Sequence, residues 1–157
     1  MNITGGLYLR FQDPVIQQIC ISQWGDGHGV TRNSFISATT LPYNLFSNNK
    51  DIQYFSEFGD LFVNCTKIMD RAFQNCSNLK VITLPEGLET INLNAFSDCS
   101  KLNSVVCMAA IPPEIETYTF SGNLNFYVPD QSVTAYKTAT NWNVFAGRIK
   151  PLSDYRG

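Results

Sequence analysis

Apolar residues recur at a fixed spacing through the middle of the chain. When residues 67–89 are written above residues 90–112, identical or similar residues coincide at a shift of 23 positions. The identical pairs are Ile68/Ile91, Ala72/Ala95, Phe73/Phe96, Cys76/Cys99, Ser77/Ser100 and Leu79/Leu102. Both copies follow one apolar skeleton, I-x4-F-x2-C-x2-L-x2-I-x-L, with conservative replacements at its last two positions. Such a period is typical of repeat proteins, in which each unit buries its apolar face only against its neighbours.

Shorter matches flank these two units. A third, shortened copy lacks the cysteine and keeps Ile115, Phe120, Leu124 and Val128. Upstream, the fragment F-x2-C-x2-[IL] recurs at Phe62, Cys65 and Ile68. We therefore expect repeat coils of about 23 residues over residues 62–129, in the length range of leucine-rich repeats.

The spacing inside each unit predicts its elements. An inward-facing strand is expected at Leu79, Ile82 and Leu84, and again at Leu102, Val105 and Cys107. A second, shorter strand is expected at Ile68, Ile91 and Ile115. The stretches AFQNC and AFSDC favour a short helical turn, because their Phe and Cys lie three residues apart. Stacked coils place equivalent residues about 4.8 Å apart, so the repeated Phe and Cys residues are expected to form ladders.

Alternation along the strands predicts an outer face opposite the core. The side chains expected on it are Val81, Thr83, Ser104, Val106 and Tyr127. Most of them are small or β-branched, so this flat face is our candidate binding site for another protein. An ordinary solvated sheet face is an equally weighted alternative, and a one-residue shift in register would turn these side chains inward.

The two ends of the chain are expected to seal the open ends of the repeats. Residues 1–61 are interpreted as an N-terminal capping module with two helices, one starting at Asp13-Pro14 and one over residues 52–62. A strand is expected before them, at Leu7, Leu9 and Phe11. Residues 130–157 are interpreted as a C-terminal cap, with Asp130 as a helix N-cap. Its bulky apolar surface is expected at Trp142, Phe145 and Ile149.

The segment WGDGHGVTRNSF at residues 24–35 has the outline of a calcium-binding loop. With Gly29 at position 6 of such a loop, only Asp26 supplies an acidic ligand. One carboxylate does not hold Ca²⁺ tightly, so we expect a Gly-rich turn and no metal site. An acid–base pair of Asp26 and His28 lacks an evident nucleophile or orienting partner.

Composition narrows the classes of function. The chain has 157 residues, 44% of them apolar and 15% charged, with a net charge of −2, which predicts one folded domain. This balance offers no electrostatic footprint for nucleic acid, and no apolar run is long enough for membrane insertion. The start MNITGGLYLRFQDP has no basic segment followed by an apolar one. We therefore expect synthesis in the cytoplasm without a signal peptide.

The cysteines and the histidine argue against catalysis and cofactors. The five cysteines are Cys20, Cys65, Cys76, Cys99 and Cys107, an odd number without a C-x-x-C pair. We expect free, buried thiols rather than a disulfide framework or a zinc site. His28 is the single histidine, so no catalytic residues and no cofactor are predicted.

The repeat motif IMDRAFQNCSNLKVITLP resembles the surface-antigen-type, or BspA-like, leucine-rich-repeat family. The stretch from AIPPEIETYTF to VFAGRIKPL resembles the terminal unit of that family, so the resemblance covers residues 62–152. It implies an α+β repeat fold: a short right-handed solenoid with N- and C-terminal caps, used for adhesion or protein binding. The front of the chain, with its degenerate EF-hand-like loop, resembles a module found in short proteins of gut anaerobes and their phages.

These expectations combine into a non-enzymatic interaction or adhesion module. We expect its partner to be another protein or a second copy of the chain, within or displayed on a phage particle. The alternatives are a host-cell surface adhesin that binds a protein or a glycan, and a self-associating structural subunit. Because no export signal is expected, the virion is favoured over the cell surface.

Overall fold

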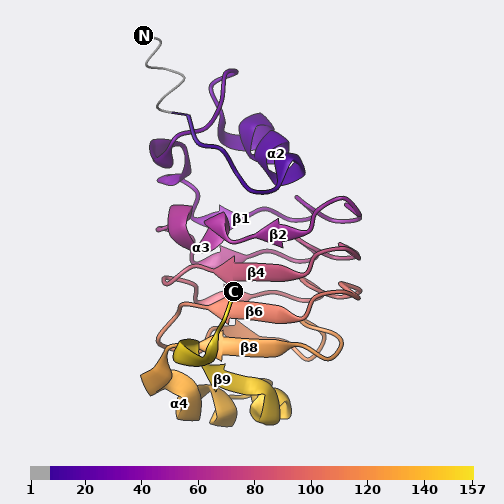
Figure 1. Ribbon diagram of the computed structural model, residues 1–157, viewed down its shortest axis with the longest axis vertical. Coiled ribbons are helices and arrows are strands. Elements are labelled where there is room, and N and C mark those ends of the chain that lie inside the picture. Colours follow the sequence, from indigo (N-terminus) through magenta and orange to yellow (C-terminus); the bar gives the residue numbers. More distant parts are fainter. Residues whose placement is uncertain (1–7) are drawn as a thin grey trace.

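The computed structural model describes residues 8–157, which form a tall stack of short parallel strands (Figure 1). The chain alternates between two sheets as it descends the stack. The four-stranded sheet has the order β1-β3-β5-β7, with bounds Thr40–Leu41, Lys67–Ile68, Thr90–Ile91 and Glu114–Ile115. The five-stranded sheet has the order β2-β4-β6-β8-β9, with bounds Tyr54–Phe55, Val81–Leu84, Ser104–Cys107, Asn125–Val128 and Ile149–Pro151. The predicted α+β repeat domain with parallel strands is therefore confirmed.

The repeats begin earlier than residue 62. Strand β1 pairs with β3 and strand β2 pairs with β4, both in parallel, so residues 40–61 contain a unit of the stack. The predicted boundary at 61/62 is therefore wrong. In this first unit the paired residues Thr40 and Lys67 lie 27 positions apart, whereas Lys67 and Thr90 lie 23 apart. A search at one constant shift does not align a unit of different length.

A column of phenylalanine rings passes through the core of the stack. Phe73 and Phe96 stack with ring centroids 4.9 Å apart and an angle of 8° between their planes. The column continues to Phe46 at 4.9 Å on one side and to Phe120 at 5.1 Å on the other. The predicted Phe ladder is confirmed and is longer than expected, because the first unit contributes a ring.

The stretches after the short strands form turns and not the expected helical turn. The Ala72 and Gln74 N–H groups donate to carbonyls three residues back, while the Phe73 and Asn75 N–H groups donate to Ala95 and Ser97 in the next layer. This alternation goes with left-handed backbone at two places in each of the first three units. The residues with φ between 58° and 61° are Asn44, Arg71 and Asn94 at one place and Asn48, Asn75 and Asp98 at the other. Asn and Asp adopt this conformation more readily than other side chains, which explains their recurrence.

The N-terminal helix α2, Pro14–Trp24, starts as predicted. One oxygen of Asp13 accepts from the Val15 and Ile16 N–H groups, and the other accepts from the Gln53 N–H at 2.7 Å. The same carboxylate therefore caps the helix and ties it to the chain just before β2. Of the expected strand before it, Leu7 lies outside the described residues. Leu9 donates a single bond to Val30, and the described residues 8–11 form no strand.

The helix expected over residues 52–62 is largely replaced by other structure. Strand β2 occupies its first half, and only a five-residue helix, α3, follows at Glu57–Leu61. A short 3₁₀-helix, η1, precedes β1 at Arg32–Phe35. The apolar run does not keep the period of a helix here, because Tyr54 and Phe55 alternate between the outer face and the core.

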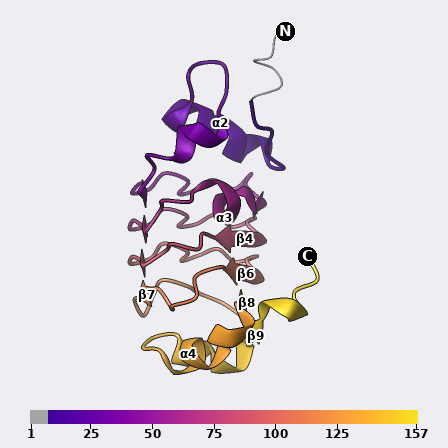
Figure 2. The same cartoon turned by 90° about the vertical axis from the view of Figure 1, so that its left-hand side faces the viewer.

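The C-terminal elements pack against the last unit (Figure 2). They are η2 Asp130–Ser132, α4 Val133–Thr138, η3 Asn143–Arg148 and η4 Leu152–Asp154. Trp142 is fully buried and donates its indole N–H to the Pro113 carbonyl at 2.7 Å. The expectation that Asp130 is a helix N-cap is wrong, because α4 starts three residues later. The Asp130 carboxylate accepts from the Ser153 N–H instead, and so fixes the segment after β9.

The Phe column is expected to dominate stability. Phe73→Ala removes a fully buried ring that stacks on rings above and below it. Since neighbouring layers are held by strand pairing and do not collapse into the gap, we expect a loss of about 3–5 kcal/mol. The measurement is equilibrium unfolding in urea, with the exposed Lys101→Ala as control. A loss below about 1 kcal/mol for Phe73→Ala would show that the column is not needed.

The left-handed turn positions allow a second test. Asn94 has φ 58°, and no side-chain hydrogen bond is found for it among the described residues. Replacement by Gly is expected to keep or raise stability, whereas replacement by Val is expected to cost about 1–2 kcal/mol. Urea unfolding of the two variants checks this, and equal midpoints would contradict the conformational explanation.

Candidate functional site

The outer face of the five-stranded sheet carries two rows of side chains. Strand pairing aligns Tyr54, Val81, Ser104 and Asn125 in one row and Thr83, Val106, Tyr127 and Lys150 in the other. Residues between them point inward, as the buried Ile82 and Phe126 show. The predicted register of the strands is thus the one observed.

Only part of the predicted binding face is accessible. Val81, Ser104 and Tyr127 line an open hollow of about 410 Å³ on this face. Val106 is 4% exposed, so its expected exposure is wrong. Thr83 is half-buried behind α3, where its methyl group lies against the backbone of Gly59 with no room for a Cβ there. These two residues contribute to packing of the protein's own elements and not to an open surface.

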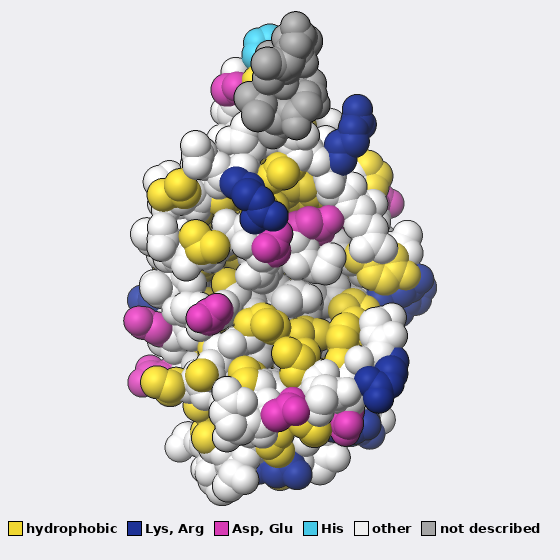
Figure 3. Space-filling model, turned by 60° about the vertical axis from the view of Figure 1, so that its left-hand side comes forward, with side chains coloured by type: hydrophobic (Ala, Val, Ile, Leu, Met, Phe, Trp, Pro, Cys, Tyr) yellow, Lys and Arg dark blue, Asp and Glu magenta, His cyan; other side chains and the backbone are white. Residues whose placement is uncertain are grey.

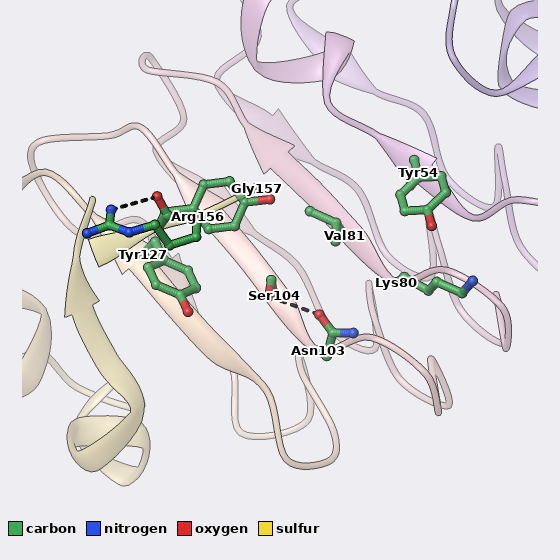
Figure 4. Close-up of a pocket in the computed structure, with 9 residues that line it drawn as sticks. Tyr54, Lys80, Val81, Asn103, Ser104, Tyr127, Arg156 and Gly157 are labelled. Atoms are coloured by element: carbon green, nitrogen blue, oxygen red, sulfur yellow. Dashed lines mark hydrogen bonds between the residues drawn. The ribbon is translucent and has the colours of Figure 1, made fainter. Parts of the chain in front are cut away.

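The remaining lining of the hollow was not expected. It consists of Tyr54, Lys80, Asn103, Tyr155, Arg156 and Gly157 (Figure 4). Tyr54 is the first member of the same row as Val81, so a comparison of units of unequal length would have found it. The last three come from the segment after β9, which returns across the sheet. Nothing in the local pattern of the sequence signals this return.

Three tyrosines and two cations are among the residues that line the hollow. The Lys80 ammonium lies 5.6 Å from the centre of the Tyr54 ring and donates to the Gln53 side-chain carbonyl. Tyr155 packs on Tyr127 with ring centroids 4.9 Å apart, and burial raises the pKa of Tyr155. One terminal nitrogen of Arg156 donates to the Ser153 and Tyr155 carbonyls. Figure 4 shows Tyr54 and Lys80 at one side of the hollow and Tyr127 and Arg156 at the other.

In the loop at residues 24–35, hydrogen bonds from the protein itself occupy Asp26, the only acidic ligand expected there. One Asp26 oxygen accepts from the His28 and Gly29 N–H groups, and the other accepts from the Tyr8 hydroxyl at 2.7 Å. The hydrogen bond from Tyr8 is the main cause that lowers the pKa of Asp26. His28 contributes its backbone N–H to this turn. Within residues 8–157, no group of three metal-ligating side chains gathers at one point.

The cysteines are core residues. All five are free and buried, as predicted. Cys76 and Cys99 occupy equivalent positions, where each thiol donates to the carbonyl of a Phe in the preceding unit, at 3.0 and 3.1 Å. Burial raises the pKa of Cys20, Cys76 and Cys99 to about 12, and that of Cys65 and Cys107 to about 11. A thiol with such a pKa is neutral at physiological pH and is not a nucleophile.

This burial predicts unreactive thiols in the folded protein. At pH 8 the thiolate fraction of every cysteine is negligible, so we expect no reaction with an aromatic disulfide reagent over an hour-scale assay. After unfolding in guanidinium chloride, all five cysteines are expected to react. Release of the coloured thiol measures both. A fast reaction of even one cysteine in the folded state would contradict the assigned burial.

Some large hydrophobic side chains that do not line the hollow are also exposed, among them Ile36, Tyr43 and Val144. Figure 3 shows such side chains gathered near the middle of the face that it displays. Two strongly exposed examples are Val63 and Ile111, with 61% and 81% of their surface accessible, and both lie in loops. Exposed apolar residues are ordinary on folded proteins, so the exposure of Val63 and Ile111 defines no second site by itself. Among residues 8–157, no helix has the length and apolar character needed to cross a membrane.

A family model matches more than half of the chain. Residues 33–127 match the family model for the BspA type leucine rich repeat region, in six copies. The matched range starts before β1 and ends within β8, so it agrees with the early start of the repeats. No curated protein matches the chain.

Proposed function

The chain belongs to the BspA-type leucine-rich-repeat family, and we propose that it is a non-enzymatic protein-interaction module. The family supports an interaction scaffold in general terms. We assign the partner to the outer face of the five-stranded sheet, at the hollow lined by Val81, Ser104 and Tyr127. Thr83 and Val106, which the sequence also favoured, are left out of this assignment because the protein's own elements cover them.

The observation that carries the proposal is the chemistry of the hollow. Its lining combines three tyrosines with Asn103 and Ser104 on a rigid sheet. Tyrosine supplies a large amphipathic contact area at low cost in side-chain entropy, and serine and asparagine supply adaptable hydrogen bonds. Aromatic residues are enriched in protein interfaces for the same reason. This combination favours recognition of a protein over catalysis.

We further propose that the repeats form a right-handed solenoid and that both ends are capped. The buried Trp142, Tyr136 and Ile149 at one end, and the Asp13-anchored helix α2 at the other, support this interpretation. Each end would otherwise leave an apolar layer without a neighbour. Rigid ends keep the outer face in one shape, which reduces the entropy lost on binding.

The setting that we propose is a phage particle, in which the module is a component or is displayed. The resemblance of the front segment to a module of gut anaerobes and their phages supports this setting. The alternative is a host-cell surface adhesin that binds a protein or a glycan, and it rests on the exposed tyrosines of the hollow. A structural subunit that associates with copies of itself is a third candidate.

One matched pair of variants tests the surface. Ser104→Arg places a long cation in the hollow, whereas Ser100→Arg makes the same change at an exposed position of the same unit. Tagged wild-type and variant proteins are incubated with native lysate and with purified particles, and co-eluting proteins are quantified by mass spectrometry. We expect Ser104→Arg to reduce capture at least about tenfold, and Ser100→Arg to leave it unchanged.

The identity of the captured proteins tests the setting. Capsid or tail proteins at a fixed ratio support the particle, while a host envelope protein or glycan alone supports the adhesin. Equal capture by wild type and Ser104→Arg would overturn the assignment of the surface. Circular dichroism and urea unfolding of both variants verify that the fold is kept.

A further inference from the structure

We infer that residues 155–157 of the chain act as a strap over the outer face, and that the partner displaces this strap with an aromatic side chain of its own. This inference rests on the proposed function and adds how access to the same surface is limited. It follows from the two hollows that the strap separates, from its few contacts with the sheet and from the ring packing that it makes.

The strap forms a wall between two hollows on the sheet. The hollow described above, of about 410 Å³, adjoins a second one of about 230 Å³. Four residues line both hollows, namely Tyr54 and Val81 of the strands and Tyr155 and Gly157 of the strap. Figure 4 shows Gly157 between Tyr127 and Val81. With the strap lifted away, the two hollows join into one groove over Tyr54 and Val81.

Few contacts hold the strap to the sheet. Within the described residues 8–157, no hydrogen bond joins residues 155–157 to a strand. The Arg156 guanidinium donates to the Ser153 and Tyr155 carbonyls, which belong to its own segment. Arg156 and Gly157 are exposed. An exposed segment without hydrogen bonds to the neighbouring sheet opens locally at a small cost in free energy.

The anchored part of the chain ends just before the strap. The Ser153 N–H donates to the Asp130 carboxylate at 3.0 Å, and the Tyr155 N–H donates to the Leu152 carbonyl within η4. These bonds keep η4 in place when the strap turns away from the sheet. The pairing of β9 with β8 lies further back in the chain and stays intact. Opening of the strap is therefore a local motion that leaves the stack unchanged.

The contact that holds the strap is made by two rings. The Tyr155 ring packs on Tyr127 with centroids 4.9 Å apart and an angle of 57° between the planes. Tilted and edge-on arrangements at this distance are favourable for aromatic pairs in general. Tyr127 can therefore pack equally well against an aromatic ring that another protein presents. A partner segment with an exposed aromatic residue competes with Tyr155 for this one place.

Such competition lowers the apparent affinity for the partner. When binding requires the open state, the apparent dissociation constant equals the intrinsic one divided by the open fraction. A strap that is closed about nine-tenths of the time therefore weakens binding about tenfold. Removal of the Tyr155 ring is expected to recover this factor.

The test supplies the strap as a separate molecule. The probe is the peptide acetyl-PLSDYRG-amide, which copies residues 151–157 and has uncharged ends. The control probe has Ala in place of Tyr. Isotope-labelled wild type and Tyr155→Ala, both full length, are titrated while NMR follows the backbone amide signals of Ser104 and Tyr127. Because a short tether corresponds to an effective concentration in the millimolar range, the probes are added up to about 5 mM.

The expected result depends on one ring in the probe and one in the protein. The Tyr probe is expected to shift the signals of Tyr155→Ala at concentrations at least about tenfold lower than for wild type. The Ala probe is expected to shift neither protein. Tyr127→Ala, added to Tyr155→Ala, is expected to remove binding. The matched control adds Tyr118→Ala, which deletes a 69% exposed tyrosine ring outside both hollows, and is expected to keep binding.

Three results would overturn the inference: equal titration of wild type and Tyr155→Ala, no shift in Tyr155→Ala, or binding that survives Tyr127→Ala. The native partner gives a second readout, since Tyr155→Ala is expected to raise its capture at least about threefold.

The proposed function fails separately. If Ser104→Arg reduces capture while Tyr155→Ala neither binds the probe nor raises capture, the interaction surface stands and only the strap is wrong. If Tyr155→Ala binds the probe while Ser104→Arg leaves capture unchanged, the ring contact of the strap stands and the assignment of the partner's surface is wrong.

Discussion

The structure depends on stacking at the spacing of parallel strands. Each layer repeats the one above it at about 4.8 Å, so an inward side chain meets its own equivalent and must pack against it. Flat aromatic rings satisfy this condition, as the column from Phe46 to Phe120 shows, with neighbouring centroids 4.9 to 5.1 Å apart. A smaller side chain in the column would leave space that no residue of the same layer can fill.

The same spacing determines the turns. Half of the N–H groups in each turn bond within the layer and half bond to the next layer, which goes with left-handed backbone at two positions. Asparagine and aspartate occupy five of these six positions in the first three units, and Arg71 is the exception. Cys76 and Cys99 pack in the core beside this column, where their thiols donate to the carbonyls of Phe46 and Phe73.

The regularity of the stack is interrupted on the outer face of the five-stranded sheet. Repetition alone would produce a flat sheet with equivalent residues in rows. Helix α3 covers Thr83 from one side, and the segment after β9 lies across Tyr127 from the other. What remains open between them is a hollow lined by three tyrosines, a lysine and an arginine, among other residues. Tyr54, Val81, Ser104 and Tyr127 of this lining lie on strands of the repeats, and residues 155–157 come from the segment after β9.

The sequence by itself determined the period, the inward positions of the strands, the Phe ladder, the start of α2 at Asp13 and the burial of the cysteines. Each of these follows from local spacing, since alternation and stacking act between residues at a constant offset. The first unit was not predicted, because its residues lie 27 positions before their equivalents in the next unit and not 23. Only the tertiary structure decided which outer residues stay open, because Tyr54 and Tyr155 line the same hollow although they lie about 100 positions apart in the chain. The burial of Val106 and the hydrogen bond from Ser153 to Asp130 could not be predicted for the same reason. Both depend on residues that are distant in the chain, which the local sequence pattern does not identify.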